Sequence, residues 1–329
     1  DAPPLAGEGV TVRSRREFLV GSTALAAGCW KGANPSFRTV EELRIQSAAE
    51  ERAAHLRMLE GFRVAADATR TTPKPGKDLL ADVPQLKPLG KVAVRLHPRF
   101  GEEPGPTRSK LGGRFAWPAG EPWPVSEQFG IPLVPVLQLA ADDAPPGFPF
   151  AEHTDLFQLL WTPREPLKPQ AVWRKRGTGP VADPPPPSPI AFPDLVPVPC
   201  RVFPERVMEY PPPEVLPSTL RDQLPEGSGT ASRLSVCPGT KVGGYPWWRG
   251  EPGKTACETC KWPMDFLAGI ASAEWTETTR DRWKPTEEPK DETGFREAAG
   301  LKLPGGAVNV FVCRRCVGWP VRAVTAEKT

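Results

Sequence analysis

Hydrophobic residues after residue 39 recur at the spacing of an α-helix, and a capping signal marks where that helix begins. Thr39 is followed three residues later by Glu42, the pattern of a capping box. The apolar residues at helical spacing are Val40, Leu43, Leu56, Leu59 and Phe62. The pattern predicts an amphipathic helix of about 27 residues, with Gly61 as the point at which it could break. We expect it to pack on the main body of the protein, and a helix that binds a partner is the alternative.

Residues 67–90 interrupt the helical pattern with Pro73, Pro75 and Gly76, and we predict a linker there. Farther along the chain, the apolar residues fall in short runs. The chain contains 44 prolines among 329 residues, and proline is excluded from helix interiors and central strands. Its 11 tryptophans and 14 phenylalanines supply a core that a disordered chain lacks. We therefore predict a β-rich α+β fold with short strands, ordered loops and few helices.

A second recurring pattern indicates an internal duplication. The sequence SKLGG at residues 109–113 recurs 131 residues later as TKVGG at residues 240–244. With the same offset, Trp117 corresponds to Trp248. A coincidence of several motifs in one register is typical of repeated structural units. Each unit is predicted to contain a Lys-x-Gly-Gly turn, and the two units are predicted to bury a shared core.

The apolar strands that follow these turns extend the correspondence. Residues 136–139 correspond to residues 267–270 at the same offset of 131. Residues 155–160 resemble residues 309–313, where the offset has grown to 154. The second copy is therefore expected to carry an insertion, and the charged, proline-containing residues 279–300 are its best candidate.

Two CxxC pairs near the C-terminus are the strongest chemical signal in the chain. Cys257 and Cys260 form the first pair, and Cys313 and Cys316 form the second. Four thiolates on two tight turns can complete a tetrahedral shell around Zn²⁺, with no position left for water or substrate. We expect a structural zinc site in the second half of the chain. A disulfide or redox pair is the alternative, followed by free thiols.

Several of these segments together resemble the YwqG-like family of bacterial proteins, a domain of unknown function. The resemblance is carried by residues 110–113 (KLGG), 137–139 (LQL) and 240–246 (TKVGGYP), and it extends over residues 90–325. The proline- and tryptophan-rich context and the paired CxxC motifs are similar to its actinobacterial branch. The resemblance implies a duplicated α+β fold with β-rich halves joined by a long crossover, and no established activity. Gly269 stands where Gln138 would have its counterpart.

The N-terminal region has the features of a twin-arginine export signal. Arg15 and Arg16 precede an uncharged stretch, residues 20–30, that is rich in glycine, alanine and threonine. Cys29 is a candidate for lipid attachment. The alternative is a short buried helix in a cytoplasmic protein. We accordingly divide the chain into a signal or extension (1–38), the helix and linker (39–90), a first repeat with a proline-rich crossover (91–239) and a second repeat with the zinc site (240–329).

Charge and hydropathy argue against two classes of partner. The formal net charge is +3, and no basic stripe is interleaved with aromatic residues in the way that tracks a phosphate backbone. Nucleic acid is therefore not an expected partner. The sequence has no uninterrupted apolar run near the ~20 residues that span a membrane.

The Lys-x-Gly-Gly turns and the tryptophans that follow them are the candidate ligand site. Backbone N–H groups at paired glycines can form an anion-binding nest, with the lysine as a point charge. If the two turns face one cleft between the repeats, a protein partner or a small ligand is expected there. The structural alternative is that the glycines permit a tight turn and the tryptophans fill the core. The candidate residues are Lys110, Gly112, Gly113, Trp117, Lys241, Gly243, Gly244 and Trp248.

The sequence favours a zinc-stabilised binding or interaction protein without catalytic activity. Motifs for phosphate-binding loops, nucleophile elbows and zinc proteases are absent from the sequence. The alternative is a hydrolase or transferase that acts in the cleft between the repeats. Its candidate acid, base or nucleophile groups are Asp142, Asp143 and His153, and they show no spacing that ties a nucleophile to a base.

Overall fold

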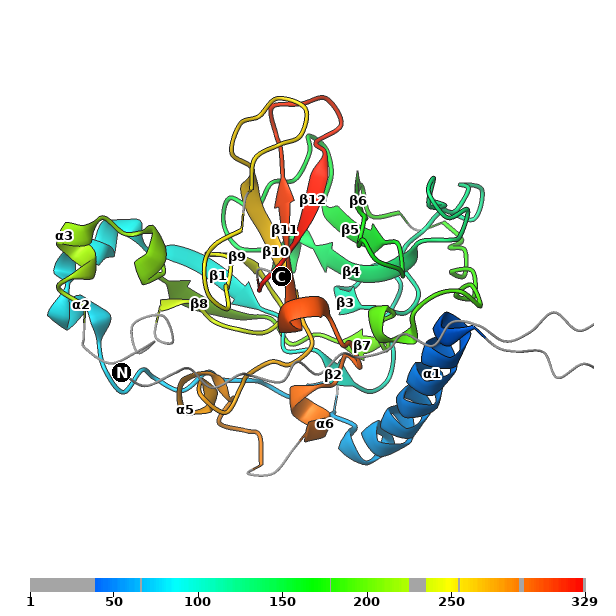
Figure 1. The fold of residues 1–329 in the computed structure, drawn as a ribbon, viewed down its shortest axis with the longest axis horizontal. Helices are drawn as coiled ribbons and strands as arrows, with labels where there is room; N and C mark the ends of the chain where they lie inside the picture. Colours follow the sequence, from blue (N-terminus) through cyan, green and yellow to red (C-terminus); the bar gives the residue numbers. More distant parts are fainter. Residues whose placement is uncertain are drawn as a thin grey trace, which may run out of the picture. The chain divides into compact units, whose positions relative to one another are not determined.

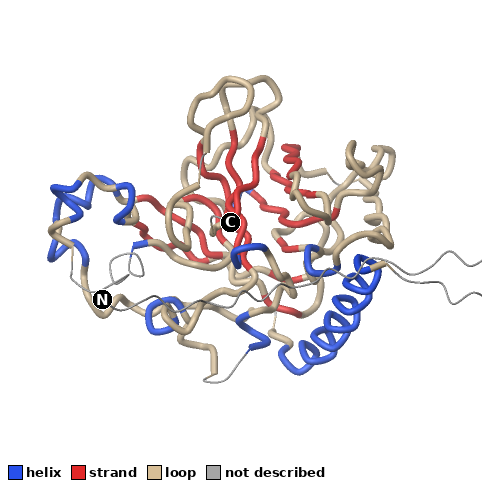
Figure 2. Tube along the Cα trace, viewed as in Figure 1, coloured by secondary structure: helices blue, strands red, loops and turns tan. Residues whose placement is uncertain are grey.

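The protein's structure is a computed structural model that describes residues 39–65, 67–177, 179–224, 235–253, 255–289 and 293–327. The export signal predicted for residues 1–38, including Cys29, lies outside the described residues and stays a prediction. Strands occupy the middle of the described fold and short helices lie at its periphery (Figure 2). The prediction of a β-rich α+β fold with few helices is confirmed.

The first helix, α1 (Val40–Leu59), begins at the predicted cap. The backbone N–H of Glu42 donates to Oγ1 of Thr39 at 3.1 Å, and the backbone N–H of Thr39 donates to Oε2 of Glu42 at 2.6 Å. The helix has 20 residues and ends in a 3₁₀ turn, η1 (Glu60–Phe62), so it is shorter than the predicted length of about 27 residues and ends at the predicted break near Gly61. Gly61 lies in this turn, where its low helix propensity favours an end to the helix.

The expected apolar face of α1 is found at its C-terminal end, where Leu56 is half-buried and Leu59 is buried, and not at its N-terminal end. Leu59 is the one buried residue of this helix, whereas Val40 and Leu43 are 85% and 52% exposed. Polar contacts also attach α1 to the protein. A guanidinium N–H of Arg52 donates to the carbonyl of Pro193 at 3.0 Å, and Nε2 of His55 donates to the carbonyl of Glu297 at 3.0 Å.

The predicted linker contains structure of its own. Residues 67–90 include α2 (Leu79–Asp82) and the 3₁₀ turn η2 (Pro84–Leu89). Leu79, Val83 and Leu86 are buried together with Leu216, which precedes α3 (Ser218–Arg221). These helices lie beside one end of the β1–β8 pair (Figure 1). The linker prediction is therefore wrong in this part, because apolar residues between the prolines form a small core.

The remaining elements are twelve strands and several short helical turns of the described chain. The strands are β1 (Lys91–Arg95), β2 (Arg99–Phe100), β3 (Lys110–Leu111), β4 (Val134–Ala140), β5 (Leu156–Trp161), β6 (Pro169–Arg174), β7 (Cys200–Arg201), β8 (Glu205–Glu209), β9 (Lys241–Gly243), β10 (Asp265–Ala271), β11 (Ala307–Val312) and β12 (Val321–Thr325). The helical turns are η3 (Ala141–Asp143), η4 (Pro193–Leu195), η5 (Pro213–Val215), α5 (Arg280–Trp283), α6 (Thr293–Arg296) and η6 (Pro304–Gly306).

The strands form two six-stranded antiparallel sheets. The first sheet has the order β12–β11–β10–β9–β1–β8, and the second has the order β2–β7–β3–β4–β5–β6. A buried apolar cluster joins them, because it contains Val242 and Ile270 of the first sheet together with Leu111 and Leu159 of the second. The two sheets therefore share one core, as the sequence predicts.

A two-stranded ribbon runs through both sheets. β1 and β2 are consecutive in the chain but belong to different sheets, and the same is true of β7 and β8. Lys91 pairs with Glu209 in the first sheet, and Phe100 pairs with Cys200 in the second. Between the sheets, the backbone N–H of Phe203 donates to the carbonyl of Leu96 at 2.7 Å. The ribbon holds the sheets together by backbone hydrogen bonds.

Taken from its other edge, the first sheet has the order β8–β1–β9–β10–β11–β12. This is the order of the second sheet with six added to each strand number, except that β1 stands in the place that corresponds to β7. Residues 131 apart also share local geometry: the bulge between Pro135 and Leu137 in β4 recurs between Phe266 and Ala268 in β10. The predicted offset of 154 for the next strand is wrong. Gln158 pairs with Gln138, and Asn309 pairs with Gly269, so Asn309 takes the place of Gln158, an offset of 151.

Candidate metal centre and ligand sites

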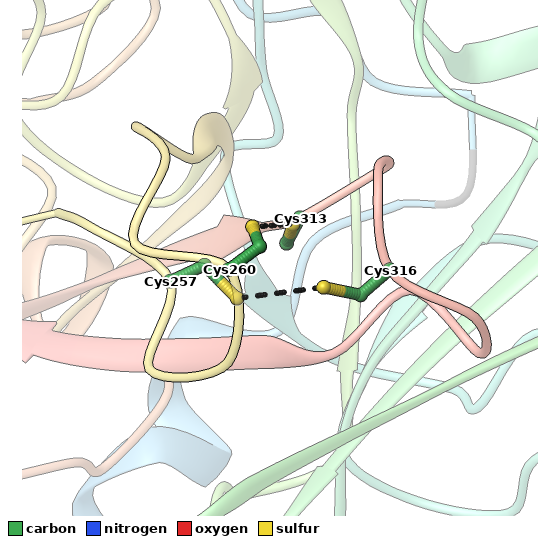
Figure 3. A group of neighbouring side chains, drawn as sticks. All are labelled: Cys257, Cys260, Cys313 and Cys316. Carbon is green, nitrogen blue, oxygen red and sulfur yellow. Dashed lines mark hydrogen bonds between the residues drawn. The ribbon is translucent and has the colours of Figure 1, made fainter.

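The four cysteines of the CxxC pairs lie together at one end of the first sheet. Cys257 and Cys260 are in the loop before β10, and Cys313 and Cys316 are in the loop between β11 and β12. Their side chains point toward one another (Figure 3). The Sγ atoms are 3.9 Å apart for Cys257 and Cys316 and 3.5 Å apart for Cys260 and Cys313, and all four lie within 4.8 Å of one another. This cluster could hold a metal ion, as predicted.

Backbone hydrogen bonds shape both cysteine loops into tight turns. In the first loop, the N–H of Cys257 donates to the carbonyl of Trp262 at 2.8 Å, and the N–H of Lys261 donates back to the carbonyl of Cys257 at 3.0 Å. In the second loop, the N–H of Cys313 donates to the carbonyl of Pro320 at 2.9 Å. Because β10 and β11 pair directly, the strands themselves bring the two turns together.

Apolar residues pack around the cysteine cluster. Cys257 and Cys313 are buried with Met264 and Phe311, and Trp248 stacks on the ring of Phe311 with centroids 6.1 Å apart. A dry shell of this kind limits solvent access to bound metal. Trp248, a predicted ligand-contacting residue, thus supports the cysteine cluster with one face of its ring.

The protein also favours the ionised form of one thiol. The backbone N–H of Cys260 hydrogen-bonds to Cys257 and lowers the pKa of that thiol to about 6. Hydrogen bonding with the side chain of Cys260 raises the pKa of Cys316 to about 12. Cys257 therefore loses its proton more readily than Cys316. A divalent cation at this site would bind thiolates and displace the thiol protons.

The Lys-x-Gly-Gly turn of the first sheet is built around a buried carboxylate. Nζ of Lys241 donates to Oε1 of Glu209 at 2.6 Å, and the two side chains are 1% and 0% exposed. The same carboxylate accepts the backbone N–H groups of Cys237 and Tyr245, each at 2.7 Å. Gly243 and Gly244 both have positive φ, 68° and 70°, which lets the chain wrap around Glu209.

The turn of the second sheet repeats this arrangement with weaker contacts. Nζ of Lys110 is 3.4 Å from Oε1 of Glu103, and the backbone N–H of Arg114 donates to the same oxygen. Gly112 and Gly113 have φ of 62° and 71°. The carboxylate of Glu103 is 39% exposed, whereas the lysine is 1% exposed. Each turn therefore pairs its lysine with a carboxylate, from Glu209 at the end of β8 in one case and from Glu103 in the loop after β2 in the other.

These contacts correct the predicted anion site. Lys110 and Lys241 are buried and bonded to protein groups, so neither presents its ammonium group to a ligand. The two turns also have different neighbours. A Cβ on Gly112 would lie 3.1 Å from the carbonyl of Val198, and one on Gly243 would lie 2.7 Å from Cγ of Pro145. The buried contacts of both lysines favour the structural alternative for these turns.

Substitution of Gly244 by alanine is expected to destabilise the fold by about 3–5 kcal/mol. The added Cβ would collide with Oε2 of Glu209 and would displace the carboxylate from its buried ion pair. Gly130→Ala is a matched control, because Gly130 has φ of 65° but nothing within 4 Å of the added Cβ. Urea unfolding measures both, and equal losses for the two variants would contradict the steric explanation.

The tryptophans of the two halves have different surroundings. Trp117 is 2% exposed and packs on Trp123 with ring centroids 5.0 Å apart, so it belongs to the core. Trp247 and Trp248 are partly exposed and line a cavity of about 550 Å³. Its other walls include Pro238, Gly239, Thr276, Thr279, Gly305 and Gly306. Of the predicted ligand-site residues, Trp248 lies at this cavity and Trp117 does not.

The predicted acid and base candidates do not form a catalytic group. Asp142 forms an ion pair with Arg176 at 2.8 Å, and the Ser109 hydroxyl donates to Asp143 at 2.6 Å. His153 is 88% exposed and lies beside Glu152. These groups have separate partners. The Ser109 hydroxyl is buried and its Oγ also accepts the backbone N–H of Ala140 at 2.9 Å, so its bond to Asp143 is a structural contact.

A buried polar cluster that the sequence analysis missed lies where the ribbon passes between the sheets. Arg95, His97 and Arg99 are fully buried. Both Nε and Nη2 of Arg99 donate to Oε1 of Glu288, at 3.0 and 2.7 Å. Nε2 of His97 donates to Oε2 of Glu205 at 2.9 Å. The sequence has polar residues at every second position here, 95, 97 and 99. Because alternate residues of a strand share a face, this pattern could have indicated the cluster.

Burial, together with the positive charges of Arg95, Arg99 and Arg70, holds the pKa of His97 well below its usual 6.5. The hydrogen bond to Glu205 favours the imidazolium, but desolvation and the three guanidinium groups outweigh it. His97 is therefore neutral in the folded protein at neutral pH. The backbone of His97 is in a left-handed conformation, with φ of 44°, and this residue lies between the end of β1 and the start of β2.

Stability is expected to fall as the pH drops below about 6.5, because the unfolded chain then takes up a proton on His97 that the folded protein does not bind. The stability that neutral His97 contributes is fully present at higher pH. In acid, the free energy of unfolding falls by up to about 1.4 kcal/mol for each pH unit. His97→Asn should reduce this slope between pH 7 and 5. His153→Asn, at an exposed histidine with φ of 62°, is the control. Unfolding titrations at both pH values test this, and an unchanged slope in His97→Asn would contradict it.

No protein-family model matches this chain, and no curated protein matches it either. Among the described residues, no helix combines the length and the apolar character that crossing a membrane requires.

Proposed function

We propose that the four-cysteine cluster holds one structural zinc ion. Zinc–sulfur bonds of about 2.3 Å in a tetrahedron place the sulfurs about 3.8 Å apart. The 3.5 and 3.9 Å separations between sulfurs of opposite CxxC pairs agree with this spacing. A disulfide needs sulfurs about 2.05 Å apart, so these distances favour a metal over that alternative. A shell of four thiolates supplies stability and leaves no site for a reacting water.

We also propose that the chain is an internally duplicated member of the YwqG-like family. The matching strand orders and the bulges 131 residues apart support the duplication. Glu103 and Glu209, which hold the two Lys-x-Gly-Gly turns, are 106 residues apart, as are Arg95 and Arg201 beside the two lysines. The second copy therefore starts at β7 instead of residue 240. The insertion lies between β10 and β11.

The function that the geometry supports best is binding of a ligand, without turnover, in the cavity lined by Trp247 and Trp248. In the first half, the indole N–H groups of Trp117 and Trp123 donate to backbone carbonyls at 3.1 and 2.8 Å. Those of Trp247 and Trp248 donate to none of the described residues. These exposed ring faces and available donors carry the proposal, since aromatic rings with hydrogen-bonding groups suit a sugar or a peptide.

A glycan and peptide array, followed by calorimetry with the best ligand, tests this function. Trp247→Ala and Trp248→Phe should each weaken binding at least about tenfold, the loss expected for a central aromatic contact. Trp262→Ala is the matched control, because Trp262 is 54% exposed but does not line the cavity. Equal affinity in all variants would refute the assigned site. Turnover of the bound ligand would favour the hydrolase or transferase alternative.

A further inference from the structure

A second cavity, of about 320 Å³, lies between the segment that precedes α2 and strand β8. Its walls carry four cationic side chains, Lys74, Lys77, Arg206 and Arg282. Two acidic side chains, those of Asp78 and Glu205, also line it. This volume lies at the small end of the range for ligand-binding cavities. The cationic side chains around this cavity therefore outnumber the acidic ones by two.

The acidic side chains of this cavity have other partners. Oδ1 of Asp78 accepts the backbone N–H of Leu80 at 2.9 Å, the cap of α2. The carboxylate of Glu205 accepts the backbone N–H of Thr72 at 2.6 Å and Nε2 of His97 at 2.9 Å. Both carboxylates are therefore held by protein donors and do not pair with the cations around the cavity.

Arg282 is the fixed cation of the site. Its guanidinium carbon lies 3.9 Å from the ring centroid of Trp283, and Nη1 donates to the carbonyl of Pro73 at 2.6 Å. Its Nε is buried and has no hydrogen-bond acceptor in the described chain, and the side chain makes no ion pair with a described carboxylate. The buried Nε cannot reach a ligand, so the donors left for an anion are Nη2 and the second N–H of Nη1, and together they can bind two of its oxygens.

The remaining groups define the shape of the ligand. Lys74 and Lys77 are exposed at the rim and can move toward a charge. The hydroxyl of Tyr210 lines the cavity and makes no hydrogen bond with the described residues. Leu79, Val207 and Met208 supply apolar wall on the same cavity.

We propose that this cavity binds a small organic phosphate, with the phosphoryl group on Arg282 and the two lysines and the organic part against Leu79, Val207 and Met208. A phosphate monoester carries close to two negative charges at neutral pH and presents several acceptor oxygens to these donors. This site shares no residue with the cavity of Trp247 and Trp248 and does not depend on the function proposed there.

Isothermal calorimetry with phenyl phosphate tests the proposal, with inorganic phosphate and phenol as comparison probes at constant ionic strength. Phenyl phosphate should bind at least about tenfold more tightly than inorganic phosphate, because the apolar wall covers its ring, and phenol should not bind. Arg282→Lys should weaken binding at least about tenfold, since lysine keeps the charge but loses the bidentate geometry. Lys175→Gln, at an exposed lysine after β6, should leave the affinity unchanged.

The double variant Lys74→Gln/Lys77→Gln gives an independent result, because both side chains are exposed and make no hydrogen bond or ion pair with the described residues. It should weaken phenyl phosphate binding at least about tenfold, since both phosphate-facing ammonium groups are lost. Absence of phenyl phosphate binding to the unmodified protein would overturn the proposal. So would full affinity in the double variant, or binding of inorganic phosphate as tight as that of phenyl phosphate.

Discussion

Chelation of the metal is expected to unfold at least the part of the protein that contains β10, β11 and β12. Zinc bound at structural sites contributes about 10–16 kcal/mol in zinc-finger peptides, comparable to the about 5–15 kcal/mol that stabilises a whole domain. The cysteine turns stand at the ends of the paired strands β10 and β11, and apolar residues pack on the cysteines themselves, so loss of the ion would disturb both the turns and this packing. Circular dichroism should show loss of tertiary structure on addition of a strong chelator, and hydrogen exchange should locate the loss to these strands.

A single ligand substitution should reproduce part of this effect. Cys313→Ser should lower the unfolding midpoint by at least about 10 °C, because several kcal/mol are lost at about 2–4 °C per kcal/mol. Cys237→Ala is the matched control, since Cys237 is equally buried but lies outside the cluster. Similar midpoints for the two variants, or a fold that is insensitive to the chelator, would show that the cluster is not a zinc site.

Glu209→Gln is expected to cost about 3–5 kcal/mol of unfolding free energy, because it leaves the ammonium group of Lys241 buried without a counter-charge. The ion pair is 2.6 Å long and both side chains are shielded from water. The corresponding variant in the other sheet, Glu103→Gln, should cost no more than about 1 kcal/mol, because its 3.4 Å pair has a partly exposed carboxylate.

Chemical denaturation of these two variants and of Lys241→Met/Glu209→Met tests the interpretation. The double variant should recover much of the loss, because it removes both charges. If Glu103→Gln and Glu209→Gln cost the same, the difference in burial does not govern the strength of the two ion pairs.

The sequence predicts the features that depend on local residue chemistry. The CxxC spacing indicates a metal cluster because two residues between cysteines suffice for a chelating turn. The pairing of β10 with β11 then brings the two turns together. The glycine pairs likewise indicate tight turns, and all four glycines have positive φ. The capping box at Thr39 correctly marks the start of α1.

The features that the sequence does not predict depend on contacts between distant segments. The partner of Lys241 is Glu209, 32 residues earlier and on another strand, so an apparently free lysine is buried in an ion pair. The cavity with Arg282 likewise combines the 72–79 segment with β8 and α5. The helix α1 was predicted too long because propensity extends through Phe62, whereas the residues after Leu59 form a 3₁₀ turn.

The metal content of the native protein tests the central claim most directly. Elemental analysis and native mass spectrometry of protein purified under reducing conditions, without added metal, should find one zinc ion per chain. A variant in which Cys313 and Cys316 are both replaced by serine should contain none. A native protein without zinc, or one in which Cys257 and Cys260 form a disulfide, would contradict the account.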